Sequence, residues 1–266
     1  MNDRQTVLPL ASSSRPLWRC LSRVAALLLM LSAFGLRAEL AGPYMAASRV
    51  IYPEGARNGV SAVFKNNGTD DYLIQAFVVR ANAVTGLPAE KVEGFLITPP
   101  VTRVNAGENH TLRVLHTGGA LPAGREAVFY LVVRLLPVGQ AGPENVKGGP
   151  HINVVKALSS KIFYRPSGLP DGGVDRAARD LTASVTLQGV TLRNPSPFWV
   201  TLRTLSVNGK AIPGESLFRM LPPFGQQQWA LPPGVSPGGE VKVAWRAVGD
   251  SGFDTDEVAV TAKGGR

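Results

Sequence analysis

Cysteine, histidine and clustered charge are all scarce in this chain. Among 266 residues there are one cysteine and three histidines, and 18% of the residues are charged. The cysteine, Cys20, lies before an apolar run near the N terminus and not at its end, so we expect neither a disulfide nor a lipid-bearing cysteine in the mature chain. A secreted domain without disulfides must be stable through its core, and this length allows one large or two ordinary domains.

Residue patterns that carry catalysis or bind metal are missing as well. His110, His116 and His151 have no His, Cys, Asp or Glu neighbours at the spacing of metal ligands. The segment 234–238, GVSPG, matches the nucleophile elbow of serine hydrolases, but Pro237 follows the serine and has no N–H for an oxyanion hole. There is no phosphate-binding glycine loop and no dinucleotide fingerprint. We therefore expect no enzyme activity, no metal and no cofactor.

The first 38 residues are typical of a secretory signal peptide. Four arginines precede the apolar run 24–36, and small residues follow it at Ala38 and Ala41. The run is thirteen residues long, shorter than the ~20 that span a bilayer, so a signal peptide is favoured over a permanent membrane anchor. We expect cleavage after Ala38, with Ala41 as the alternative, and a mature chain without stable membrane insertion.

Removal of this segment changes the charge balance. The formal net charge falls from +9 for the whole chain to +5, from 23 basic and 18 acidic residues. The remaining Lys and Arg are scattered, and aromatic side chains are not interleaved with them. A nucleic-acid partner is therefore not expected.

Glycine and proline are abundant, with 29 and 21 residues, which is typical of an ordered, turn-rich β protein. Apolar segments separated by turns predict seven strands in the first half, at 48–52, 59–65, 72–80, 94–98, 111–115, 127–136 and 151–166. We expect the second and third of these strands to pair as a hairpin through the turn 66–71. The same turn chemistry explains the formal glycosylation sequon at Asn67.

The segment 151–166, HINVVKALSSKIFYRP, is unusually long and carries apolar residues on both sides of the pleat. Strands average about 5 to 6 residues, and this one extends to Pro166, which lacks an N–H and ends the ladder. The surplus length suggests that the strand has a partner besides its own core.

Composition changes at 167–175, SGLPDGGVD, which we interpret as a linker. Further strands are expected at 183–193, 198–207, 226–231, 241–247 and 257–261, with a hairpin turn at Asn208-Gly209 and no helical period. The predicted fold is therefore all-β, with two antiparallel immunoglobulin-like sandwiches at residues 39–166 and 176–266.

Six motifs occur along the chain at SRVIY 48–52, TPPVTRV 98–104, GREAVFY 124–130, KIFYRP 161–166, NPSPF 194–198 and GDSG 249–252. Together, and in this order, they resemble the periplasmic pilus and fimbrial assembly chaperones of the chaperone-usher pathway. The most specific motif is KIFYRP, and the likeness runs from about Ala46 to the C terminus.

The resemblance implies two immunoglobulin-like domains arranged in an L, with an interdomain cleft, and a location in the periplasm. Such chaperones bind and stabilise pilus subunits by adding the last long strand of the first domain to the subunit's open groove, and they deliver the subunits to an outer-membrane usher. In strand addition, backbone hydrogen bonds supply affinity and alternate side chains fill pockets. The donor-strand residues implied here are Ile152, Val154 and Leu158.

The resemblance also implies roles for charged residues. Arg49 and Lys161 match a basic pair that holds the subunit's C-terminal carboxylate through charge-assisted hydrogen bonds. Glu126, Arg165 and Asp250 match a salt bridge between the domains, which we expect to be structural.

Two features depart from the family pattern. Lys156 stands where an apolar donor residue is more common, so one subunit pocket is expected to be shallow, polar or differently registered. Lys161 has the opposite strand parity to the donor residues, and a β-bulge between Leu158 and Lys161 would reconcile them. The short loop before His151 resembles that of chaperones serving rod-like pili, and the exposed strand allows self-association of the free chain.

The alternative interpretation is a secreted immunoglobulin-like structural or adhesive protein of a surface fibre. A fibre subunit should lack a final strand and carry a donor extension at its N terminus, whereas this chain has a surplus strand. Arg49 and Lys161 also favour the chaperone.

Overall fold

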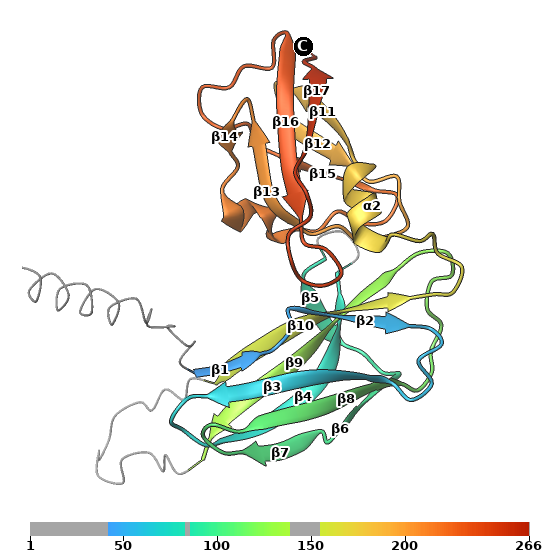
Figure 1. Ribbon diagram of the computed structural model, residues 1–266, viewed down its shortest axis with the longest axis vertical. Helices are drawn as coiled ribbons and strands as arrows, with labels where there is room; N and C mark the ends of the chain where they lie inside the picture. Colours follow the sequence, from blue (N-terminus) through green and yellow to red (C-terminus); the bar gives the residue numbers. More distant parts are fainter. Residues whose placement is uncertain (1–41, 83–85, 139–154, 266) are drawn as a thin grey trace, which may run out of the picture. The chain divides into compact units, whose positions relative to one another are not determined.

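The computed structural model describes residues 42–82, 86–138 and 155–265 (Figure 1). The predicted signal peptide and its two cleavage positions lie outside the described residues, as do Ile152 and Val154 of the predicted donor strand. Where the chain is described, two β-sandwiches follow one another along it, so the prediction of an all-β fold with two sandwiches is confirmed.

The first sandwich has two sheets. One sheet contains, in spatial order, β1 (Gly42–Met45), β3 (Val60–Asn67), β8 (Asn109–His116) and β6 (Phe95–Thr98). The other contains β2 (Arg49–Pro53), β10 (Lys156–Arg165), β9 (Ala127–Pro137), β4 (Tyr72–Ala81) and β5 (Pro88–Lys91), and β7 (Val101–Val104) also pairs with β4. Three short strands, β1, β5 and β7, lie outside the predicted ones.

The central strand β9 is covered on both faces, as its almost continuous apolar sequence predicts. Phe129, Leu131 and Val133 alternate into the core between the two sheets. Val128 and Tyr130 point to the opposite face, where they are buried in a second cluster that includes side chains of the other sandwich. Part of the outer face of this sheet therefore touches the second sandwich.

The predicted hairpin between 59–65 and 72–80 is wrong, because β3 and β4 belong to different sheets. The buried Asn66 stabilises the crossing, since its amide donates to the carbonyl oxygens of Asp70 at 2.8 Å, Asn105 at 3.0 Å and Val104 at 3.4 Å. These bonds give backbone carbonyl groups at the crossing a hydrogen-bond donor. A local Asn-Gly signal indicates a turn, but it does not specify the sheet that the next strand joins.

The second sandwich is smaller. Its sheets contain β11 (Thr182–Thr186), β12 (Gly189–Arg193) and β15 (Gln226–Trp229), and β14 (Lys210–Ala211), β13 (Leu202–Val207), β16 (Glu240–Ala247) and β17 (Val258–Lys263). The core contains Trp245, whose indole N–H donates to the carbonyl oxygen of Ala178 at 2.9 Å. A short 3-10 helix, η1 (Gly214–Phe218), follows β14.

Local structure in the second half differs from the prediction in several places, and the strand expected at 198–207 begins only at Leu202. The expected strand 183–193 is a hairpin of β11 and β12 that turns at Leu187 and Gln188. The helix α2 (Gly173–Arg179) includes the last three residues of the predicted linker and buries Val174 and Ala177 in the second core. Seven residues are too few to produce a helical period in the sequence, so packing against this core stabilises the helix.

Strand β10 pairs antiparallel with β9 from Lys156 to Tyr164 and parallel with β2 from Lys161 to Arg165. The pairing with β9 advances one residue at a time, so the expected bulge between Leu158 and Lys161 is absent. Leu158 packs, partly buried, against the first core, whereas Lys161 points to the other face of the sheet. Among the described residues, 156–160 have a partner strand on one side only.

No helix in the described part of the chain combines the length and the apolar character needed to cross a membrane.

Candidate functional site

The parallel pairing of β2 with β10 places Arg49 directly beside Lys161. These residues are 112 positions apart in the sequence, and each begins the paired part of its strand. Side chains at paired positions of neighbouring strands point to the same face, so the two cations are held side by side.

Arg49 is buried, with 6% of its surface exposed. Its Nη1 donates to the carbonyl oxygen of Val248 in the second sandwich at 2.6 Å, and its guanidinium lies 5.3 Å from the centroid of the Phe163 ring. Burial lowers the pKa of Arg49, and the charges of Asp250 and Glu126 oppose that shift. The group stays charged in any case, and its Nε is buried without a hydrogen-bond partner among the described residues.

Lys161 is half-buried and approaches the hydroxyl oxygen of Thr201 at 3.4 Å. Burial lowers the pKa of Lys161 to about 8, and the neighbouring charges of Arg49 and Arg203 add to the effect. Two cations therefore share one partly desolvated position. An anion placed there would stabilise both charged forms.

The two cations line a cavity of about 350 Å³. Ser48 also lines it from the first sandwich, and the second sandwich contributes residues that include Thr201, Arg203 and Phe218. The charge of Arg203 is already paired, since its Nε lies 2.8 Å from Asp254 Oδ1. Within the described ranges, no carboxylate forms a salt bridge with Arg49 or Lys161. The cavity can therefore take a carboxylate between two hydrogen-bond donors.

The predicted donor residues are placed only in part. Leu158 shares strand parity with the buried Ile162 and Tyr164, so its side chain lies on the side of the domain's own core. Lys156 has the same parity but is exposed near the start of β10. The opposite parity of Lys161 needs no irregularity of the strand, because Leu158 and Lys161 lie on opposite faces of one regular strand.

The predicted salt-bridge residues meet around one guanidinium. Arg165 donates through Nη2 and Nε to Glu126 Oε1 at 2.6 and 2.9 Å, and through Nη1 and Nη2 to the two oxygens of Asp250 at 2.8 and 2.9 Å. Arg165 and Glu126 belong to the first sandwich, and Asp250 follows β16 in the second. Burial lowers the pKa of Arg165, but its hydrogen bonds and charge contacts with the two carboxylates more than offset this and raise it.

Glu126 is held by the second sandwich as well. The backbone N–H of Trp199 donates to Glu126 Oε2 at 2.9 Å, and the Trp199 indole N–H donates to the Glu126 carbonyl oxygen at 3.2 Å. Burial raises the pKa of Glu126 to about 7, against the charge of Arg165 and the Trp199 N–H. Trp199 carries no recognisable sequence signal, because its contact partner lies 73 residues away.

Gly173 makes room for the same network. It has a φ of +47°, and a Cβ at this position would collide with Asp250 Oδ2. The glycine at the start of α2 therefore lets the carboxylate of Asp250 reach Arg165.

The NPSPF motif at 194–198 has a physical reason too. The amide of Asn194 donates to the carbonyl oxygens of Phe198 and Pro222 at 2.7 and 3.1 Å, and its oxygen accepts from the N–H and hydroxyl of Ser196. The centroid of the Phe198 ring lies 5.0 Å from Cζ of the Arg165 guanidinium. The motif thus forms a rigid loop beside the ion pairs.

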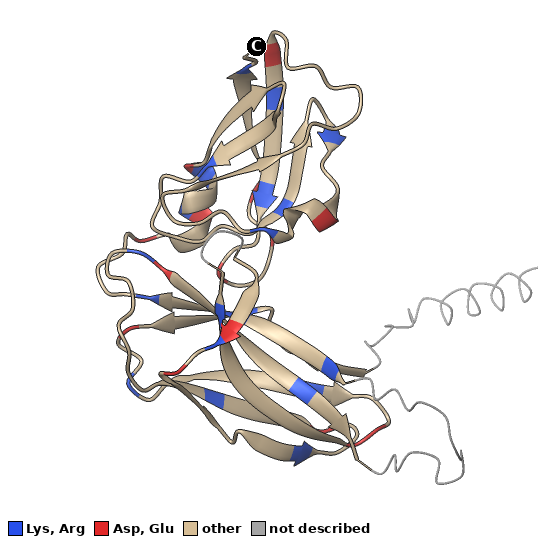
Figure 2. Ribbon diagram, turned by 180° about the vertical axis from the view of Figure 1, so that it is seen from behind, with Lys and Arg blue, Asp and Glu red and all other residues tan. Residues whose placement is uncertain are grey.

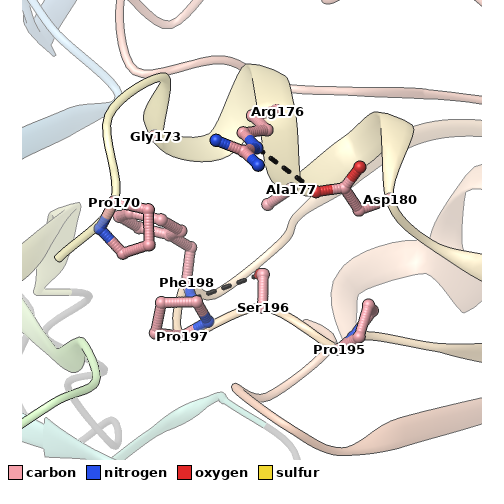
Figure 3. Close-up of a pocket in the computed structure, with 9 residues that line it drawn as sticks. All are labelled: Pro170, Gly173, Arg176, Ala177, Asp180, Pro195, Ser196, Pro197 and Phe198. Carbon is pink, nitrogen blue, oxygen red and sulfur yellow. Dashed lines mark hydrogen bonds and ion pairs between the residues drawn. The ribbon is translucent and has the colours of Figure 1, made fainter.

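A second cavity, of about 280 Å³, lies between this loop and α2 (Figure 3). Its wall is formed largely by prolines and Phe198, and the charged pair Arg176 and Asp180 is joined at 3.6 Å. Its charged side chains are therefore already paired, unlike the cations of the first cavity.

Charge elsewhere is dispersed. Lys and Arg are spread over both sandwiches in the described residues (Figure 2). In the same part of the chain, no three His, Cys, Asp or Glu side chains gather in a way that could hold a metal ion.

Comparison with protein families gives two matches. Residues 44–170 match the family described as "Pili and flagellar-assembly chaperone, PapD N-terminal domain". Residues 176–259 match "Pili assembly chaperone PapD, C-terminal domain".

Individual proteins with similar sequences and structures are also found. The uncharacterized fimbrial chaperone YcbF of Escherichia coli is 32% identical over 87% of this chain and 93% of its own length. The chaperone protein FimB/FhaD of Bordetella pertussis is 34% identical over 80% of this chain and 87% of its own length. The solved complex of the Salmonella enterica SafA pilin with the SafB chaperone contains a chain with TM-score 0.67 and 27% identity, covering 84% of this chain and 97% of that one.

We expect Arg165→Ala to loosen the contact between the sandwiches. The substitution leaves Glu126 buried without its guanidinium, which should lower the free energy of unfolding by about 3 kcal/mol. Urea unfolding measures the stability, and small-angle scattering measures the change in interdomain angle. Arg176→Ala, which removes an exposed ion pair, is the control and should change neither by much. An unchanged scattering profile for Arg165→Ala would contradict the role assigned to this network.

Proposed function

Because this chain belongs to the family of PapD-like pili-assembly chaperones, we propose that it binds pilus subunits in the periplasm by donating strand β10 and delivers them to an outer-membrane usher. The family is one of assembly chaperones, which favours this function over that of a fibre subunit. One observation carries the proposal. Arg49 and Lys161 are neighbouring cations that form no salt bridge within the described residues, and they lie at the end of a free strand edge.

The edge geometry supports strand addition. Residues 156–160 of β10 have β9 on one side, and β2 occupies the other side only from Lys161 onward. A strand added along the free edge must therefore end where β2 begins. Since β10 runs toward Lys161, an added strand that runs parallel to it brings its C-terminal carboxylate to Arg49 and Lys161.

The donor residues of this proposal are Ile152, Val154 and Leu158, which share one strand parity. Leu158 lies partly against the first core, so an added subunit would extend that core rather than use the opposite face of the strand. Lys156 interrupts the row with an exposed charge, and the subunit pocket that it meets should be shallow or polar.

The carboxylate anchor is tested by Arg49→Ala and Lys161→Ala. Each variant should fold but lower the amount of subunit that co-purifies from the periplasm by at least about tenfold, because a charge-assisted hydrogen bond contributes roughly 1.5–3 kcal/mol. Lys263→Ala, an exposed cation on β17, is the matched control and should leave recovery unchanged. Undiminished recovery with both test variants would refute the anchor.

The affinity should also depend on pH. The pKa of Lys161 without a bound ligand is about 8, and a bound carboxylate raises it. Because a terminal carboxyl group is ionised above about pH 5, binding is strongest at about pH 5–7 and weakens as the pH rises above 8. We expect a loss of roughly tenfold between pH 7 and 9.5 for a peptide with a free C-terminal carboxylate, measured by fluorescence anisotropy. Lys161→Arg keeps its charge over this range and should bind with a flat profile. An equally steep loss in Lys161→Arg would assign the titration to another group.

Delivery to the usher requires a second surface, and the outer face of the first sandwich supports this step. Leu73 and Leu136 are paired directly across β4 and β9 and are 37% and 39% exposed, and Val101 of β7 is 48% exposed on the same sheet. Apolar side chains gathered on one exposed face commonly mark a protein contact.

The double variant Leu73→Asp and Leu136→Asp tests this surface. We expect subunit co-purification to persist while surface pili are lost, because the docking face would carry two charges. Pili are counted by electron microscopy, and Leu187→Asp, at an exposed turn of the second sandwich, is the control. Normal piliation by the double variant would exclude this face as the usher contact.

A further inference from the structure

The cavity beside the cation pair has an apolar wall that no part of the carboxylate anchor uses. This wall is η1 of the second sandwich, which contributes Leu217 and Phe218. Leu217 is 4% exposed and belongs to the second core, whereas Phe218 is 68% exposed. Leu217 and Phe218 thus give the cavity an apolar wall, of which Phe218 is the exposed part.

The position of Phe218 is fixed by its neighbours. Leu217 anchors η1 in the core, and the carbonyl oxygen of Ser216 accepts a hydrogen bond from the Trp229 indole N–H at 2.8 Å. The backbone that carries Phe218 is thus held by the two residues that precede it. Its exposure follows from the direction of the side chain and not from a loose loop.

Arg49, Lys161 and Phe218 line the same cavity of about 350 Å³, which lies within the size range of small-ligand pockets. A carboxylate bound by the cations belongs to the last residue of the added strand. The side chain of that residue therefore enters the same cavity, where Phe218 is the exposed apolar group available to it. Thr201 and the paired Arg203 add polar groups near the carboxylate.

We infer that Phe218 packs against the side chain of the subunit's C-terminal residue, so that the chaperone selects subunits ending in an aromatic or large apolar residue. This inference rests on the proposed binding of a subunit carboxylate at Arg49 and Lys161. It assigns Phe218 to specificity, while the cation pair provides the anchor.

The test uses the purified mature chain and fluorescein-labelled peptides of one alternating apolar sequence. The peptides differ only in the last residue, Phe or Ala, and each is made as a free acid and as an amide. Fluorescence anisotropy should give roughly tenfold tighter binding for the acid that ends in Phe than for the acid that ends in Ala, as expected for an aromatic contact together with its buried area. Phe218→Ser should reduce this ratio to within about twofold.

A matched control separates this contact from a general loss of apolar surface. Phe224→Ser removes another aromatic side chain of the second sandwich, 57% exposed, which does not line the cavity, and it should keep the tenfold preference. Thermal unfolding of each variant verifies that the second sandwich is folded.

The outcomes distinguish the inference from the proposed function. Equal binding of the two acids by the unaltered chain, with weak binding of the amides, overturns the role of Phe218 and leaves the carboxylate anchor standing. A preference that persists in Phe218→Ser overturns the role as well. Equal binding of acids and amides refutes the anchor, and the inference with it.

Discussion

The parallel pairing of β2 with β10 is the contact on which the proposed site depends. It places Arg49 beside Lys161, and it also ends the free edge of β10 at that point. Under the proposed function, this one pairing would determine where an added strand stops and which charges meet its terminus.

The contact between the sandwiches keeps the far side of the cavity in place. Thr201 and η1 line it from the second sandwich, while Arg165 joins Glu126 and Asp250 close to the junction. Burying Glu126 is unfavourable in itself, as its raised pKa shows, and a well-packed apolar contact would be at least as stable. The directional ion pairs and the hydrogen bonds of Trp199 instead define the geometry between the sandwiches.

The two cavities differ in how their charged side chains are paired. In the cavity beside α2, the charged side chains pair with one another, and the nearby Asn194 network is satisfied internally. In the cavity beside β10, two partly buried cations have no carboxylate partner among the residues that the structure describes, and Arg49 Nε lacks a hydrogen bond. Unsatisfied buried donors are rare in folded proteins. Of the two cavities, the one beside β10 is therefore the better candidate for a ligand-binding site.

The fold could be predicted from the sequence because its signals are periodic and local: apolar alternation, turn residues and a run at 127–136 that is apolar on both faces. The family resemblance carried by the six motifs pointed to Arg49, Lys161, Glu126, Arg165 and Asp250 as candidates. The hairpin at 66–71 was predicted wrongly, because a turn signal specifies a reversal of the chain but not a sheet. The choice of sheet depends on contacts between distant residues, such as those of Asn66 with Val104 and Asn105. Only the tertiary structure decided the face of Leu158, the regular register of β10, and the position of Trp199 and Phe218, since each depends on contacts between residues far apart in the chain.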